Sequence, residues 1–310
     1  MTYRHYLTLF ILLLCCIGSI RLIEAEEVKA LRIITVRDRQ EAQQIRQQLS
    51  KGASFSALAA QKSLGPERQV WGYSGTVRLS DVQSELRGVL QSLQPGQISD
   101  VIAVGQQFVI IKVISPQIER YYETADRALA QNKIEVALEA LQAALKLERD
   151  NIETYLRLAT VYSLARRYKD ALPYLDQAYR YAPQSIQVLM LHSATYTKAA
   201  VAHNDRAYAD TALQDYETVL QMSPSLAPSV NFGMGKIYLA VLQQPQKAIS
   251  HLEKAVRPLP DIPEVYELLI RAYYETKRYT EARDYLRLAQ RLGFEFPKLQ
   301  DALRNVKQQQ

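Results

Sequence analysis

Apolar residues recur at helical spacing through the second half of the chain, and most regularly in residues 152–185. Two sets of apolar or small residues stand there, and most of their members are three or four positions apart. They are Tyr155, Leu158, Ala159 and Tyr162, followed by Ala171, Leu175 and Ala178. Positions at these separations lie on one face of a helix, so the pattern predicts two amphipathic helices, over 153–165 and 168–181. Pro183 ends the second helix because proline cannot continue it.

The same arrangement recurs on both sides of this stretch and predicts five consecutive helix pairs. We delimit the pairs at 118–151, 152–185, 186–226, 227–262 and 263–294. The third pair has a longer corner, around 200–209, whose helical composition predicts an extension of both helices. Residues 295–310 are expected to form a capping helix and a tail. Five stacked pairs exceed the three or so that a stable solenoid needs.

Residues 26–117 follow a different pattern. Residues 28–36 alternate between apolar and polar side chains as a strand does. Helices are expected over 38–49 and 82–93, and a short helix is expected to follow the turn 51–55 and to end near 63. Further strands are expected over 70–73, 98–104 and 107–114. The order β-α-α-β-α-β-β in a region of this length predicts a small α+β domain.

The N-terminus has a third kind of pattern. Residues 7–20 are almost wholly apolar, and Arg4 precedes them. This run is shorter than the ~20 residues that a membrane-spanning helix needs, so residues 1–25 are predicted to be a secretory signal peptide, cleaved after Ala25. An uncleaved anchor through residues 7–20 is the alternative, and it is the only membrane attachment that we expect.

Both cysteines of the chain, Cys15 and Cys16, lie inside this apolar run. A lipoprotein signal would place a small residue directly before the modified cysteine, whereas Leu14 precedes Cys15. Attachment through a lipid therefore stands as a weaker alternative. Cleavage after Ala25 would leave no cysteine for disulfides, metal sites or nucleophilic catalysis.

Composition narrows the functional classes. The 310 residues are 48% hydrophobic and 23% charged, and the net charge of +6 is spread along the chain. No basic run with interleaved aromatic residues appears, so no nucleic-acid partner is expected. The four histidines have no partners at metal-ligand spacing, and no phosphate-binding loop or hydrolase motif is present, so neither a metal nor another cofactor is expected. One of them, His192, stands at a position where the repeat pattern has an apolar residue.

The helix pairs resemble the tetratricopeptide repeat. Seven residues of the second pair match the signature positions of that repeat: Tyr155, Leu158, Ala159, Tyr162, Ala171, Leu175 and Ala178. The resemblance implies a solenoid that binds polypeptides in a groove formed by the first helix of each pair. The register places twelve residues in that groove, although ordinary surface or neighbour packing is the alternative for each of them. They are Tyr122, Asp126, Leu156, Thr160, Met190, Ala194, Lys198, Phe232, Lys236, Glu267, Arg271 and Tyr274.

Residues 26–117 are similar to the parvulin-type peptidyl-prolyl isomerase domain. The segments that carry the resemblance are KGASFSALA from Lys51, WGY from Trp71, LQPGQIS from Leu93 and FVIIKV from Phe108. The resemblance implies a four-stranded sheet with a pocket that binds the twisted X-Pro amide better than the planar one. The uncatalysed rotation has a barrier of about 18–20 kcal/mol.

The positions that carry chemistry in that family are changed in this sequence. The two histidines of active members fall on Arg32 and Val109, the Cys or Asp falls on Gly65, and the pocket aromatic falls on Leu86. No histidine and no cysteine occurs anywhere in residues 26–117. We therefore assign no catalytic residue. Arg32 could replace an imidazole as a hydrogen-bond donor, but a solvated arginine on an exposed strand is the favoured interpretation.

These patterns together predict an exported protein-binding scaffold of a bacterial periplasm or cell envelope. It would hold client polypeptides or support an assembly such as one for secretion or polysaccharide export. Two alternatives stay open. The first is an active peptidyl-prolyl cis-trans isomerase whose repeats recruit substrate, and the second is a scaffold in which the parvulin-like domain only caps the array.

Overall fold

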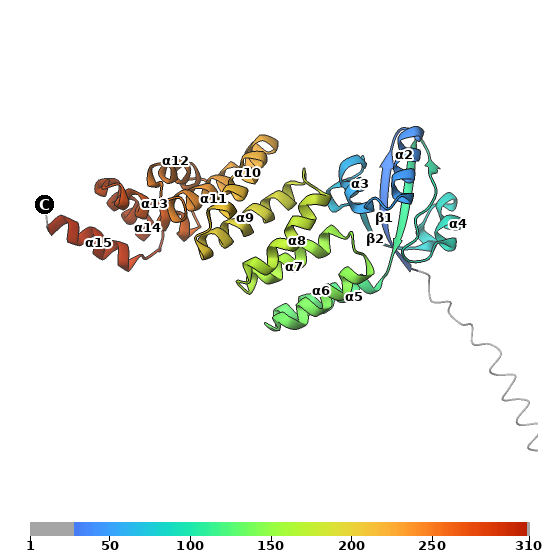
Figure 1. Ribbon diagram of the computed structural model, residues 1–310, viewed down its shortest axis with the longest axis horizontal. Helices are drawn as coiled ribbons and strands as arrows, with labels where there is room; N and C mark the ends of the chain where they lie inside the picture. The colour runs from blue at the N-terminus through green and yellow to red at the C-terminus, as the bar shows by residue number, and fades with distance from the viewer. Residues whose placement is uncertain (1–27, 309–310) are drawn as a thin grey trace, which may run out of the picture.

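The computed structural model describes residues 28–308. The predicted signal segment and both cysteines lie outside these residues. The molecule is elongated, with a small α+β domain at one end and a stack of helices that extends away from it (Figure 1). No helix in the described part of the chain has the length and apolar character needed to cross a membrane.

The α+β domain is built on an antiparallel four-stranded sheet with the order β2-β1-β4-β3. Its strands are β1 (Val28–Val36), β2 (Tyr73–Arg78), β3 (Ile102–Val104) and β4 (Gln107–Ile114). The two central strands carry mostly apolar residues on both faces because both faces are covered. Successive residues of a strand point to opposite faces, so each central strand contributes to two separate cores.

Three α-helices and two short 3₁₀ helices cover the sheet. The α-helices are α2 (Arg39–Ser50), α3 (Phe55–Lys62) and α4 (Ser84–Ser92), and the 3₁₀ segments are η2 (Pro66–Val70) and η3 (Leu79–Asp81). Ile34 and Ile110 pack with α2 and α3 on one face. Leu31 and Val109 pack with η3 and α4 on the other face.

The helical array consists of five helix pairs and a final helix (Figure 1). The pairs are α5 (Gln117–Ala130) with α6 (Ile134–Leu147), α7 (Ile152–Leu164) with α8 (Tyr168–Tyr181), α9 (Ile186–His203) with α10 (Arg206–Met222), α11 (Ala227–Ala240) with α12 (Pro245–Val256), and α13 (Pro263–Glu275) with α14 (Tyr279–Arg291). A short 3₁₀ segment, η4 (Pro224–Leu226), precedes α11, and α15 (Pro297–Gln308) ends the array.

All five pairs turn in the same way. One residue in each corner has a positive φ, between 49° and 60°, and none of the five is a glycine. They are Asn132, Arg166, Asn204, Gln243 and Lys277. A residue in the left-handed conformation ends the first helix and reverses the direction of the chain. Small buried residues then let the second helix pack closely against the first. In the fourth pair, a Cβ on Gly235 would lie 2.6 Å from Cγ of Leu252, so the two helices touch there.

The predicted fold class is confirmed: a small sheet domain precedes a long run of repeat helices. Two local expectations were wrong. The segment expected as a strand over 70–73 contains the end of η2 and Trp71 with a φ of 52°, so β2 begins only at Tyr73. The strand expected over 98–104 is shorter, because Ile98 makes only an isolated bridge to Lys112 and β3 starts at Ile102.

Candidate functional site

The α+β domain and the repeats meet at a buried ion pair. Arg32 of β1 is 2% exposed, and its Nε and Nη2 donate to the two carboxylate oxygens of Glu148 at 3.0 and 3.2 Å. Its Nη1 donates to the backbone oxygen of Trp71 at 3.0 Å. Glu148 lies between α6 and α7, so a charge of the sheet is neutralised by a turn of the repeats. The expectation of a solvated Arg32 was wrong.

Lys112 of β4 extends this pair into a cluster of four charges. It is the cross-strand neighbour of Arg32, and its Nζ lies 2.9 Å from Glu148 and 3.1 Å from Asp150. Asp150 also accepts from the hydroxyl of Ser54 at 3.0 Å and the backbone N–H of Phe55 at 2.9 Å. These two groups stand at the N-terminus of α3, where backbone donors and the helix dipole favour a carboxylate. Burial alone would raise the pKa of Asp150, but Lys112 and the bond from Ser54 lower it below its ordinary value of 3.8.

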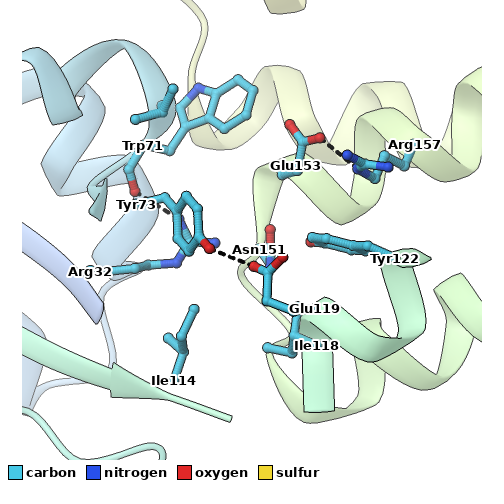
Figure 2. A pocket seen from close by; sticks show the side chains of 11 residues that line it. Arg32, Trp71, Tyr73, Ile114, Ile118, Glu119, Tyr122, Asn151, Glu153 and Arg157 are labelled. Atoms are coloured by element: carbon cyan, nitrogen blue, oxygen red, sulfur yellow. Dashed lines mark hydrogen bonds and ion pairs between the residues drawn. The ribbon is translucent and has the colours of Figure 1, made fainter. Parts of the chain in front are cut away.

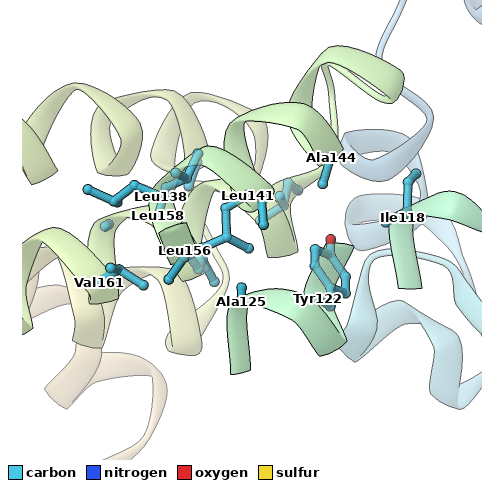
Figure 3. Close-up of a cluster of buried hydrophobic side chains, with 14 of the residues drawn as sticks. Ile118, Tyr122, Ala125, Leu138, Leu141, Ala144, Leu156, Leu158 and Val161 are labelled. Carbon is cyan, nitrogen blue, oxygen red and sulfur yellow. The ribbon is translucent and has the colours of Figure 1, made fainter. Parts of the chain in front are cut away.

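Apolar packing continues across the same boundary. Ala30, Trp71 and Ile114 of the sheet domain belong to one buried cluster with side chains of the first two repeats. Figure 3 shows the repeat side of that cluster, where Ile118 and Tyr122 of α5 stand next to the interior formed by α6 and α7. The chain passes from β4 to α5 through only two residues, so strand and helix are held close together. The sheet domain and the first repeats therefore share a core.

A cavity of about 260 Å³ opens beside the ion cluster (Figure 2). Residues of β1, the η2–β2 segment, β4, α5 and α7 line it. They are Arg32, Val70, Trp71, Tyr73, Ile114, Ile118, Glu119, Tyr122, Asn151, Glu153 and Arg157. The walls are largely aromatic or aliphatic, and most of the charged groups stand on the repeat side. This cavity exists only because the two domains are joined.

Two polar contacts cross or border the cavity. The Tyr73 hydroxyl donates to Glu119 across it at 2.6 Å. Burial, together with the bond to Glu119, raises the pKa of Tyr73 to about 12, so this hydroxyl keeps its proton. On the far wall, Arg157 donates to Glu153 at 2.7 Å, and its guanidinium lies 4.5 Å from the ring centre of Tyr122.

The four degenerate family positions do not surround one site. Arg32 lies on the sheet face covered by α3 and the repeats, whereas Val109 and Leu86 belong to the core between the sheet and α4. Gly65 lies after α3, where a Cβ would meet the carboxylate of Glu67 at 2.0 Å. Leu31 and Ile33 of β1 share a core with Val109, and Thr35 is its cross-strand partner. The two family histidine positions therefore lie on opposite faces of the sheet, and a pocket on the α4 face would have Ile33, Thr35 and Val109 as strand residues but not Arg32.

The residues expected in the repeat groove are distributed over five first helices and differ in exposure. Tyr122 and Leu156 are buried, so their placement on a solvent-facing groove was wrong; the Tyr122 hydroxyl is 2.6 Å from that of Thr154. Exposed members are Asp126, Thr160, Lys198 and Glu267, and half-buried members are Met190, Ala194, Phe232, Lys236, Arg271 and Tyr274.

Several of these side chains already have partners inside the array. Asp126 accepts from Arg157 at 3.1 Å, and Lys236 pairs with Glu264 at 2.5 Å. Arg271 lies 3.3 Å from Glu275 on its own helix, and the ring of Tyr274 is edge-on to Tyr279. The structure therefore brings no compact set of the predicted residues together.

The third repeat contains a polar cluster that the sequence pattern did not reveal. His192 is buried, with Nδ1 2.5 Å from Asp215 and Nε2 3.2 Å from Asp176. Its ring stacks on Tyr179 and lies next to Tyr196, whose hydroxyl donates to Asp176. Among the described residues no group of three or more His, Cys, Asp or Glu side chains has a metal-binding arrangement.

The residues that matter most at the domain junction were missed at the sequence level. They are Lys112, Glu119, Glu148 and Asp150. The sequence did contain one indication of the junction. Residues 148–151, directly before the second repeat pair, read Glu-Arg-Asp-Asn and form a turn rich in charge. Nothing in this turn indicated that its carboxylates face a sheet rather than solvent.

Comparisons with known proteins agree with this architecture. Residues 30–115 match the rotamase family, described as the PPIC-type PPIASE domain, and residues 128–195 and 232–293 match two tetratricopeptide-repeat families. A comparison with curated proteins found no matching sequence.

Three solved structures match parts of the chain. A structure described as "MamA RS-1 ArsTM double mutant" has a TM-score of 0.50 at 17% identity, and the match covers 58% of this chain and 96% of that one. PilF of Pseudomonas aeruginosa has a TM-score of 0.50 at 19% identity, with 62% and 85% covered. A PpiC-type peptidyl-prolyl cis-trans isomerase domain is 28% identical with a TM-score of 0.27, over 29% of this chain and 91% of that one. The first two likenesses show the fold of the repeat array.

We expect Glu148→Gln to lower the free energy of unfolding by about 3–5 kcal/mol, because it leaves the buried Arg32 and Lys112 without their shared carboxylate. Urea unfolding followed by circular dichroism measures this. The matched control is Glu135→Gln, which removes an exposed partner of Arg167 and should cost at most about 1 kcal/mol. Equal effects of the two substitutions would contradict the role given to the ion cluster.

We expect the stabilising effect of Asp150 to depend on pH. Its pKa in the folded protein is lowered, so the carboxylate stabilises the fold above its ordinary pKa of 3.8 and loses that effect as the pH falls through the folded-state value. The difference in unfolding free energy between the natural protein and Asp150→Asn should therefore be largest near pH 7 and shrink below about pH 4. Urea titrations at a series of pH values measure it, and a difference independent of pH would refute the assignment.

Proposed function

Because the chain carries a PPIC-type rotamase domain followed by tetratricopeptide repeats, we propose that it is an exported protein-binding scaffold whose rotamase domain does not catalyse proline isomerisation. The repeats bind polypeptide partners, and the rotamase domain holds one end of the array. No cofactor and no nucleic acid takes part in this function.

The observation that carries the proposal is the state of the family's histidine positions. Arg32 directs Nε, Nη1 and Nη2 to Glu148 and Trp71 and is 2% exposed, so this side chain is not available to a substrate amide. On the other face Val109 and Ile33 carry no polar side-chain atom, and Thr35, the cross-strand partner of Val109, carries a hydroxyl but no ionisable group. Residues 26–117 contain no histidine and no cysteine that could take over the role. The side chains at the two family histidine positions therefore cannot donate hydrogen bonds to the amide of a bound proline peptide.

The binding role rests on the repeat architecture. The first helices of successive pairs contact one another, α7 with α9, α9 with α11, and α11 with α13. Together they form a continuous helical face with exposed polar groups such as Thr160, Lys198 and Glu267. Extended repeat surfaces of this kind bind polypeptides over several helices.

The proposal also assigns a compartment to the protein. This assignment rests on the pattern of residues 1–25, in which a basic residue precedes a short apolar run and a small residue ends the segment. A bacterial periplasm or cell envelope is the location that this pattern favours. Retention of the segment as an anchor would place the array at the membrane surface.

The match to the rotamase family over residues 30–115 favours one alternative function. In that alternative the α4 face of the sheet binds an X-Pro segment in an apolar pocket and eases its rotation by shape alone. The repeats would then recruit the substrate.

A protease-coupled proline-isomerisation assay separates the two functions. We expect the full chain to leave the isomerisation rate at its uncatalysed value, because the site lacks polar groups aimed at the amide. A histidine-bearing rotamase serves as the positive control, and circular dichroism shows that the sample is folded. Acceleration that increases in proportion to the concentration of this protein would establish the isomerase and overturn the inactive assignment.

A further inference from the structure

The junction cavity contains a carboxylate without a cation. Glu119 accepts one hydrogen bond, from Tyr73, and within residues 28–308 no lysine, arginine or histidine lies within ion-pair distance of it. An ionised carboxylate can accept several hydrogen bonds, so most of its capacity is unused. Figure 2 shows this carboxylate in the middle of the cavity, between the wall of Trp71 and Tyr73 and the wall of Tyr122.

The surrounding charges leave the cavity with an excess of negative charge. Arg32 and Lys112 are balanced by Glu148 and Asp150 in the neighbouring cluster. Arg157 on the opposite wall has two carboxylate partners, Glu153 at 2.7 Å and Asp126 at 3.1 Å.

Because Arg157 is already balanced, the charge of Glu119 has no counterion in the cavity. A half-buried carboxylate next to low-polarity walls attracts a cation more strongly than an exposed one does.

The remaining walls suit a long aliphatic stem. Ile114, Ile118 and Trp71 are apolar parts of the lining, and the half-exposed Val70 adds an apolar residue that reaches solvent. The ring of Tyr122 already has the Arg157 guanidinium over it at 4.5 Å, which shows that a cation is accommodated at this aromatic wall. The volume of about 260 Å³ fits one side chain and excludes a folded element.

We propose that this cavity binds the cationic side chain of an arginine or a lysine in a partner polypeptide, with its charged head on Glu119 and its methylene groups along Trp71 and Ile118. The inference rests on the proposed function as a polypeptide-binding scaffold and adds a ligand class to it. Since the walls come from both domains, the ligand binds only when the rotamase domain and the first repeat are docked, and it stabilises that arrangement.

The single tryptophan of the chain reports on the cavity directly. Trp71 lines it, so its fluorescence, excited apart from the tyrosines, should change as the cavity fills. The probes are N-acetyl-arginine amide and N-acetyl-lysine amide, compared with the neutral analogues N-acetyl-citrulline amide and N-acetyl-norleucine amide. We expect saturable changes with the two cations, at dissociation constants on the order of millimolar for so small a ligand, and none with the neutral probes.

Substitutions identify the group that binds. Glu119→Gln should weaken the cationic probes by about tenfold or more, because it removes the charge and keeps the shape. Glu123→Gln is the matched control, since Glu123 is exposed on the same helix and should leave binding unchanged. Tyr73→Phe keeps the ring and frees Glu119 of its donor, so it should retain binding even if Glu119→Gln proves unstable in a thermal melt.

Two results would overturn the inference: neutral probes that bind as tightly as the cations, or affinities that Glu119→Gln leaves unchanged. A photo-crosslinker at Lys198 or Glu267 tests partner binding by the repeats separately. If partners are crosslinked but the cationic probes do not bind, only the assignment of the cavity is refuted. Probe binding without crosslinked partners would instead contradict the proposed scaffold.

Discussion

The buried contact between Arg32 and Glu148 is the constraint on which the arrangement of the molecule depends. Burying an arginine in the middle of a sheet requires a carboxylate that is buried with it and neutralises its charge. Here that carboxylate comes from a turn 116 residues further along the chain. Such a pair contributes little net free energy compared with an apolar substitute, but its geometry permits one orientation of the two domains. Lys112 and Asp150 repeat the requirement on the next strand and at the start of α3. The pairing therefore fixes orientation more than it adds stability.

Because of this buried contact, the rotamase region and the repeat region are not structurally independent domains. The family matches separate a rotamase region from a repeat region, yet Ala30, Trp71 and Ile114 share a hydrophobic core with the first two repeats. Asp150 of the repeats even accepts the first backbone N–H of a helix in the sheet domain. Neither region satisfies all of its buried polar groups alone.

The helices and strands could be predicted from the sequence because local periodicity determines them. The three-and-four spacing around Leu158 and Ala159 gives helix pairs, and the alternation in residues 28–36 gives the first strand. The junction was not readable in the same way. A single sequence shows that Arg32 interrupts an apolar strand, but it does not show which distant carboxylate neutralises it.

Exposure in the repeat groove was misjudged for a related reason. Tyr122 and Leu156 stand at groove-facing register, but α7 covers Tyr122, and both side chains lie in the core shared with the sheet domain. The first repeat has the rotamase domain where an inner repeat would have another helix pair. Register alone predicts exposure only for repeats whose neighbours are known.

The shared core gives the array a polarity. The repeats next to the sheet domain are held by buried charges and by apolar packing against a sheet, whereas the later described repeats have mainly helices as neighbours. In a solenoid each repeat is stabilised chiefly by its neighbours, so local opening is easiest where stabilising contacts are fewest. We therefore expect the later repeats to open before the first ones, and a protease that digests opened segments would leave the rotamase domain with the first repeats as the last resistant fragment.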